Sequence, residues 1–82
     1  MAWRPEFTRD LFLKVQASPR KEALRIALLS ARDEVEAAES LRDMPSLGST
    51  KSGHPAFFAA GCILLCRIDE KNQTCTFTDV AI

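Results

Sequence analysis

The sequence predicts a small α+β domain in which two N-terminal helices precede a C-terminal antiparallel β-hairpin, in the order α-α-β-β. Three observations support this prediction. Apolar residues recur at helical spacing as far as residue 42, strand-forming residues dominate from residue 60, and a segment rich in proline, glycine and serine separates the two halves. With 82 residues, the chain is expected to form one domain, residues 1–82, around one modest core.

The first helix is expected to start at Pro5. Phe7, Leu11 and Val15 fall on one helical stripe, which indicates a single buried face. Ser18 followed by Pro19 is typical of a second helix start, because the hydroxyl caps the end and proline needs no amide partner there.

The second helix is expected over residues 19–42. Its apolar seam repeats at spacings of four and three residues. Ile26 and Leu29 are expected to widen this seam and to be buried in its first half. The seam consists of Leu24, Leu28, Ala31, Val35, Ala38 and Leu41.

Residues 44–56 are expected to form a flexible loop, and the hairpin follows it. A turn at residues 69–72 sets the register of the two strands. The expected cross-strand pairs are Ile68 with Gln73, Cys66 with Cys75, Leu64 with Phe77, and Cys62 with Asp79. One face then carries Leu64, Cys66, Ile68, Cys75 and Phe77, and the other carries Ile63, Leu65, Thr76, Thr78 and Val80.

The charges are balanced overall but separated along the chain. The formal net charge is zero, which removes the usual electrostatic signature of a nucleic-acid-binding protein. Residues 1–25 are nevertheless basic and residues 26–43 are acidic. Mutual neutralisation along solvated helix faces is the simple interpretation, and a complementary partner is the alternative. The basic patch would consist of Arg4, Arg9, Lys14, Arg20, Lys21 and Arg25.

Four residues of zinc-ligand type, His54, Cys62, Cys66 and Cys75, occur near the hairpin. Their spacing argues against a metal site, because positions 62 and 66 of a strand lie ~13 Å apart. Buried apolar thiols are the preferred interpretation, with a regulatory disulfide between Cys66 and Cys75 as an alternative.

No catalytic constellation is found. The glycine bracket at residues 48–53 resembles a phosphate-binding loop, but its lysine lies inside the bracket and a helix precedes it where a strand is needed. The sequence therefore predicts no enzyme, no cofactor and no metal.

The chain shows no secretory signal and no apolar run of membrane-spanning length, so a membrane association is not expected. Three cysteines without such a signal favour a reducing compartment, and the cytoplasm is the expected location.

The hairpin is expected to carry the function. Its first strand is apolar on both faces, and one edge is expected to lack a neighbour within the chain. The sequence thus predicts a small protein-interaction module that pairs with a second copy as a homodimer, or with a larger protein that it regulates or inhibits. The interaction residues would be Ile63, Leu65, Thr76, Thr78, Val80 and Ile82. The alternatives are a nucleic-acid-associated regulator that uses the basic patch, and a thiol- or metal-responsive protein that uses the three cysteines.

Overall fold

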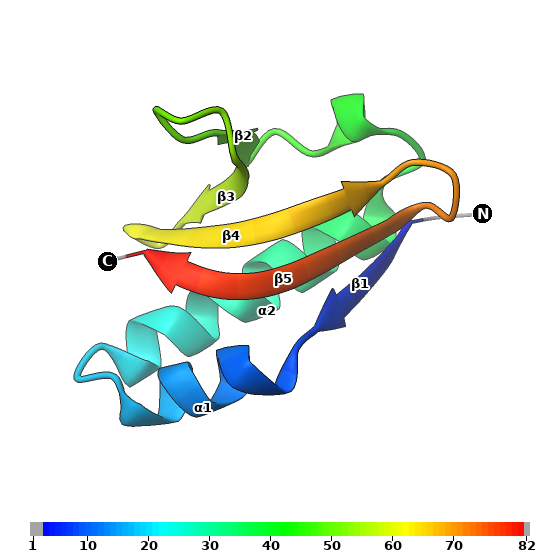
Figure 1. Cartoon of the computed structure of the whole chain (residues 1–82). Helices are drawn as coiled ribbons and strands as arrows, with labels where there is room; N and C mark the ends of the chain where they lie inside the picture. The colour runs from blue at the N-terminus through cyan, green and yellow to red at the C-terminus, as the bar shows by residue number, and fades with distance from the viewer. Residues whose placement is uncertain (1–2, 82) are drawn as a thin grey trace.

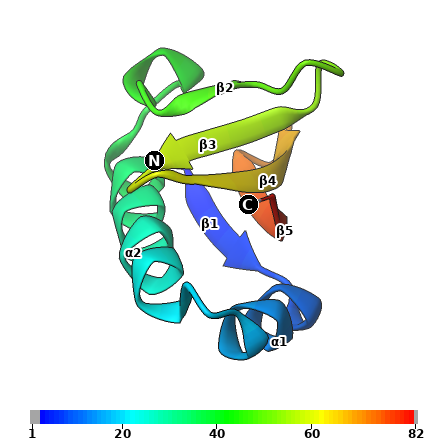
Figure 2. The ribbon, with the colours of Figure 1, turned by 90° about the vertical axis from the view of Figure 1, so that its left-hand side faces the viewer.

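The computed structural model describes residues 3–81 as two layers, a five-stranded β-sheet and two helices packed against one of its faces (Figures 1 and 2). The elements follow the order β-α-α-β-β-β-β, with a short 3₁₀ turn after the second helix. Their bounds are β1 Arg4–Phe7, α1 Arg9–Ala17, α2 Lys21–Ala37, the 3₁₀ turn Leu41–Asp43, β2 Leu47–Ser49, β3 Pro55–Ala59, β4 Cys62–Asp69 and β5 Thr74–Ala81.

The sheet has the strand order β1-β5-β4-β3-β2. The strand β1 pairs in parallel with β5, and the other neighbours are antiparallel. The class α+β therefore holds, but the predicted α-α-β-β order is wrong. A mixed sheet of five strands replaces the isolated two-stranded hairpin, which is marginally stable on its own.

The first described element is the strand β1, where the sequence predicts a helix. Pro5 lies in β1, and the helix begins only after Thr8, whose side-chain oxygen accepts a hydrogen bond from the Leu11 amide at 3.3 Å. Proline lacks an amide donor, which an edge strand tolerates as readily as a first helical turn does. The prediction of a helical stripe over Phe7, Leu11 and Val15 is therefore correct for Leu11 and Val15 and wrong for Phe7. Leu11 and Val15 are buried on α1, whereas Phe7 reaches the core from the sheet.

The helix α2 is shorter than predicted, and its buried stripe is narrower. It ends at Ala37, and its buried stripe includes Leu24, Leu28 and Val35. Ile26 and Leu29 lie on its outer side, 60% and 50% exposed, so the expectation that they are buried is wrong. Neither helix is long and apolar enough to cross a membrane, within the part of the chain that the structure describes.

The segment 44–56 contains β2 and the first residues of β3. Glu34 of α2 fixes its start, because its two carboxylate oxygens accept hydrogen bonds from the amide and the hydroxyl of Ser46, both at 3.0 Å. A two-residue turn then joins β3 to β4, with Ala60 at φ 52° and Gly61 at φ 73°. Positive φ at both residues is the geometry of a type I′ hairpin turn.

The turn between β4 and β5 lies one residue later than predicted, at residues 70–73, and this shifts the partner of each β4 residue from Cys66 to Ile68 by two. Asp69 pairs with Thr74, so the expected pair of Ile68 with Gln73 is wrong, and so are the other pairs in that register. A slip of two residues leaves each side chain on its expected face. The predicted core face of this hairpin is therefore correct.

A bulge changes the second half of β5. The pairing shifts between Leu65 and Cys66, and Thr78 is the extra residue. Beyond it, Val80 pairs with Leu64 and packs against the core. The prediction that Val80 lies on the opposite face is therefore wrong.

Three aromatic rings lie at the centre of the core. Phe77 of β5 stacks on Phe7 of β1, with ring centroids 5.3 Å apart, and meets the edge of Phe57 of β3 at 5.2 Å. Phe57 and Phe77 are both fully buried. Aromatic pairs at these distances attract each other, and this stabilises the fold beyond the effect of the buried area. Phe77 therefore links strands on both sides of β4.

Truncation of this ring tests its role. Replacement of Phe77 by Ala is expected to lower the free energy of unfolding by about 3–5 kcal/mol, because it removes a buried ring and leaves a cavity. Phe12→Ala is the matched control, since Phe12 is 50% exposed and its loss is expected to cost far less. Urea denaturation of both variants measures the difference, and equal losses would contradict the central role of Phe77.

Candidate functional site

One face of the sheet is left uncovered by the described elements. Both helices pack on the face that carries the aromatic core, where α1 contacts β5 and α2 contacts β1, β3 and β4. The opposite face, called the open face below, presents alternate residues of β1, β3, β4 and β5. The ladder register divides it into two halves of different chemistry.

The apolar half consists of Phe58, Ile63 and Leu65 together with Ala56, which is fully buried. Phe58 pairs with Ile63 across β3 and β4, and Ala56 pairs with Leu65 beside them. Phe58 is 44% exposed, and Ile63 and Leu65 are half-buried. The Phe58 ring extends over β2, where a Cβ on Gly48 would lie 3.2 Å from it. Glycine at position 48 therefore leaves room for the Phe58 ring.

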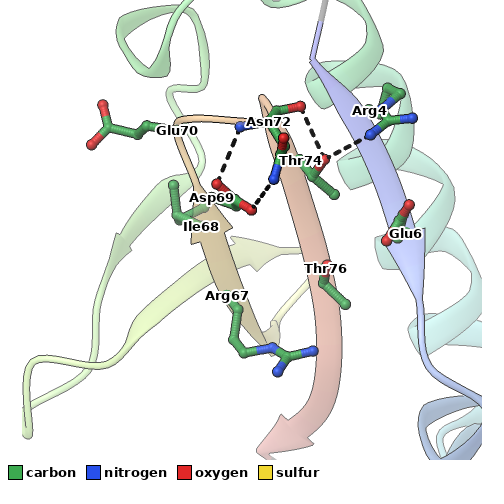
Figure 3. Close-up of a pocket in the computed structure, with 9 residues that line it drawn as sticks. All are labelled: Arg4, Glu6, Arg67, Ile68, Asp69, Glu70, Asn72, Thr74 and Thr76. Carbon is green, nitrogen blue, oxygen red and sulfur yellow. Dashed lines mark hydrogen bonds between the residues drawn. The ribbon is translucent and has the colours of Figure 1, made fainter.

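The charged half surrounds Thr74 and Thr76 of β5. In one row, Thr76 lies between Glu6 of β1 and Arg67 of β4. In the next row, Thr74 lies between Arg4 of β1 and Asp69 of β4. Figure 3 shows these side chains along a shallow hollow that spans the three strands. The hollow is polar and of mixed sign.

Local hydrogen bonds order one end of the hollow. Asp69 accepts hydrogen bonds from the Asn72 amide at 3.1 Å and from the Asn72 side chain at 2.8 Å, which shapes the β4–β5 turn. The Asn72 side-chain hydrogen bond, followed by its backbone one, holds the pKa of Asp69 below its usual value. The Thr74 hydroxyl donates to the Asn72 carbonyl and accepts from Arg4 at 3.3 Å. Asp69 therefore stays ionised at neutral pH.

The structure separates the predicted interaction residues. Ile63, Leu65 and Thr76 lie on the open face. Thr78 lies in the bulge, and Val80 packs against the core. Ile82 lies outside the described residues. Phe58 and Glu6 were not among the predicted site residues, and Arg4 was predicted only as part of the basic patch, because neither segment was assigned to the sheet.

The outer edge of the hairpin is covered only in part, because β1 pairs with residues 74–77 and no described strand pairs with residues 78–81 of β5 on that side. β4 pairs with β3 on one side and β5 on the other, and β5 pairs in turn with β1. The outer strands of the sheet are instead β1, with four residues, and β2, with three.

The basic residues of the N-terminal stretch do not form one patch. Arg4 lies in the charged half of the open face, and Lys14 forms an ion pair with Asp79 at 2.6 Å. Arg25 lies 3.7 Å from Glu22 on the helical layer. Arg9 and Arg20 are exposed at the start of α1 and before α2, and Lys21 opens α2.

A second, smaller groove lies on the helical layer, between α1 and α2. Phe12, Val15 and Leu28 form its apolar part, and Lys21 and Arg25 border it. The exposed side chains of Leu13, Ile26 and Leu29 give this layer further apolar surface. Exposed apolar residues are common on protein surfaces and identify no partner by themselves.

The three cysteines are free and buried. Cys66 and Cys75 share the core face in diagonal positions, and a hydrogen bond with the Cys66 sulfur, together with burial, raises the pKa of the Cys75 thiol. Their predicted direct pairing across the strands is wrong, because Cys66 faces Phe77 and Cys75 faces Ile68. Over residues 3–81, His, Cys, Asp and Glu form no group of three that is able to hold a metal ion.

Searches against protein-family models and against curated proteins find no match for this sequence.

The ion pair between Lys14 and Asp79 predicts a pH-dependent contribution to stability. Lys14 holds the pKa of Asp79 below its usual value, so the pair stabilises the fold above the unfolded pKa of about 3.9 and loses this contribution as pH falls through the lower, folded pKa. Because both groups are partly exposed, Lys14→Met is expected to cost less than about 1 kcal/mol at pH 7. Urea denaturation at pH 7 and at about pH 2 should show a loss only at the higher pH. A loss of equal size at both values would contradict this account.

The buried thiols predict low reactivity in the native protein. A thiol reagent requires thiolate and access, and Cys62, Cys66 and Cys75 are each at most 3% exposed. Native protein is expected to react only at the rate at which it opens, whereas unfolded protein reacts at once at all three positions. Fast reaction of one thiol in the native state would overturn this expectation.

Proposed function

We propose that this protein is a small, non-enzymatic interaction module that binds another protein through the open face of its sheet. The observation that carries this proposal is the apolar half, in which Phe58 is 44% exposed and Leu65 lies on the central strand β4 with no described element above it. An apolar surface on an ordered sheet is stabilised when a second surface covers it.

The composition of the face supports protein as the partner. Protein interfaces combine a core of aromatic and aliphatic side chains with a polar rim, and arginine is enriched among their strongest contacts. Phe58 and Leu65 supply the first component, and Arg67 and Glu6 supply the second. By contrast, the mixed signs of the charged half give no continuous positive path for a nucleic-acid backbone.

The mode of binding follows from the topology. The outer strands β1 and β2 are short, and β1 contains Pro5, which donates no ladder hydrogen bond. Face-to-face stacking is therefore favoured over strand addition. A module of this kind acts by covering a surface of its partner, as a regulator or an inhibitor does. Three free thiols are compatible with a reducing compartment such as the cytoplasm.

Substitution of Leu65 tests the proposal, because a partner that covers this face must bury the middle of β4. Self-association is measured by sedimentation velocity. Any protein captured from a lysate is identified, purified and titrated directly against the module. Leu65→Asp is expected to weaken either association by at least about tenfold, as loss of a central apolar contact does.

Ile26→Asp is the matched control, since Ile26 is an exposed apolar residue of the helical layer. Leu65→Thr is the second variant, because threonine retains strand propensity while it shortens and polarises the contact. Circular dichroism establishes that each variant is folded. Association that survives both Leu65 variants but is lost with Ile26→Asp would place binding on the helices and reject the open face. Absence of any association would also reject the proposal.

A further inference from the structure

The charged half of the open face has a sign pattern that is complementary to itself. Two rows of side chains cross β5, and each row has opposite charges at its two ends. One row runs from Glu6 through Thr76 to Arg67, and the other runs from Arg4 through Thr74 to Asp69 (Figure 3). Both basic residues therefore have an acidic residue at the same level on the opposite side of β5.

These four charged groups are not neutralised by ion pairs within residues 3–81. The ion pairs in this range join Lys14 to Asp79, Arg25 to Glu22, and Arg32 to Asp33. Arg4 contacts only the Thr74 hydroxyl, Glu6 and Arg67 are exposed, and Asp69 contacts the neutral Asn72. The charges are therefore free to pair with a second surface.

We propose that the partner of this face is a second copy of the chain, related by a two-fold axis that runs along β5. This inference rests on the proposed function, since it names the partner of the same face. Rotation about β5 exchanges the β1 side of the sheet with the β4 side. Arg67 of one copy then lies over Glu6 of the other, and Asp69 lies over Arg4, with each contact made twice.

The geometry of packed sheets permits these contacts. Neighbouring strands are separated by about 4.8 Å, and stacked sheets by about 10 Å. The groups on β1 and β4 are thus equally far from the axis, and each lies directly above its opposite charge. An arginine and a glutamate are together long enough to span the gap between the sheets. Thr74 and Thr76 lie on the axis, where small side chains let the two sheets approach.

The electrostatics favour a second copy over a partner of one sign. The formal net charge of the chain is zero, so two copies approach without long-range repulsion. Had either row carried the same sign at both ends, the two-fold arrangement would place like charges together. Both rows instead carry opposite signs, which gives the pairing its specificity.

The available area predicts a reversible dimer. Rotation about β5 overlaps β1, β5 and β4 of the two copies and leaves β3 outside the contact. Two strand spacings and the eight residues of β4 outline a contact of about 250 Å² in projection. Stable interfaces bury about 800 Å² on each partner, so this dimer belongs with the weaker, concentration-dependent ones. Its contacts are partly exposed to solvent, and salt is therefore expected to weaken it.

Charge exchange at Glu6 and Arg67 tests the arrangement. In a homodimer of Arg67→Glu, or of Glu6→Lys, each contact between copies joins two like charges, so both variants are expected to dimerise at least about tenfold more weakly than the wild type. An equimolar mixture of the two variants restores both opposite-charge contacts. The mixture, and the double variant Glu6→Lys with Arg67→Glu, are therefore expected to recover the wild-type affinity. Sedimentation velocity at low salt, with native mass spectrometry of the mixture, measures each species.

Two controls carry the same changes in charge at exposed positions elsewhere, Lys51→Glu in the β2–β3 loop and Glu36→Lys on α2. Both are expected to dimerise like the wild type. A wild-type protein that stays monomeric at high concentration would overturn the inference, as would a dimer that is unaffected by Arg67→Glu or a mixture that remains monomeric. In those cases a Leu65-dependent association with a different protein would leave the proposed function intact. Loss of all Leu65-dependent association would reject both.

Discussion

The packing of Phe77 is the interaction on which the rest of the structure depends. Its ring contacts Phe7 on one side and Phe57 on the other, so a single side chain connects three strands that are distant in sequence. The parallel pairing of β1 with β5 brings Phe7 opposite Phe77. This contact joins β1 to the aromatic core. The aromatic cluster thus explains both the core and the unexpected first strand.

A core of this kind covers only one side of the sheet. Two helices are sufficient to bury the aromatic face, and the described chain contains no further element for the other face. The central strand β4 shows the consequence, because Leu64 is fully buried beneath it while Leu65 points to the open face. One-sided cover leaves a large apolar residue at the centre of an ordered surface. The proposed function follows from this imbalance.

The sequence predicted the periodic features and missed those set by tertiary contacts. The core face of β4 and β5 was predictable, because a two-residue slip does not change the side on which a residue lies. The bulge at Thr78 was not, since nothing in its neighbours marks an extra residue. Ala60 at a positive φ concealed the β3–β4 turn, because alanine seldom adopts that conformation. Phe58 was consequently left outside the predicted sheet and outside the predicted site.

The role of the charges on either side of β5 depends on the presence of β1. In an isolated hairpin, Arg67 and Asp69 would be two charges at a solvated edge, which is a common means of preventing aggregation. With β1 beside β5, the same two residues face Glu6 and Arg4 across a central row of threonines. Charges that would discourage strand addition in one topology thereby become, in the other, the pattern on which the proposed face-to-face pairing rests. The aromatic core holds the parallel strand β1 beside β5. With β1 in place, the charges on either side of β5 form a self-complementary surface.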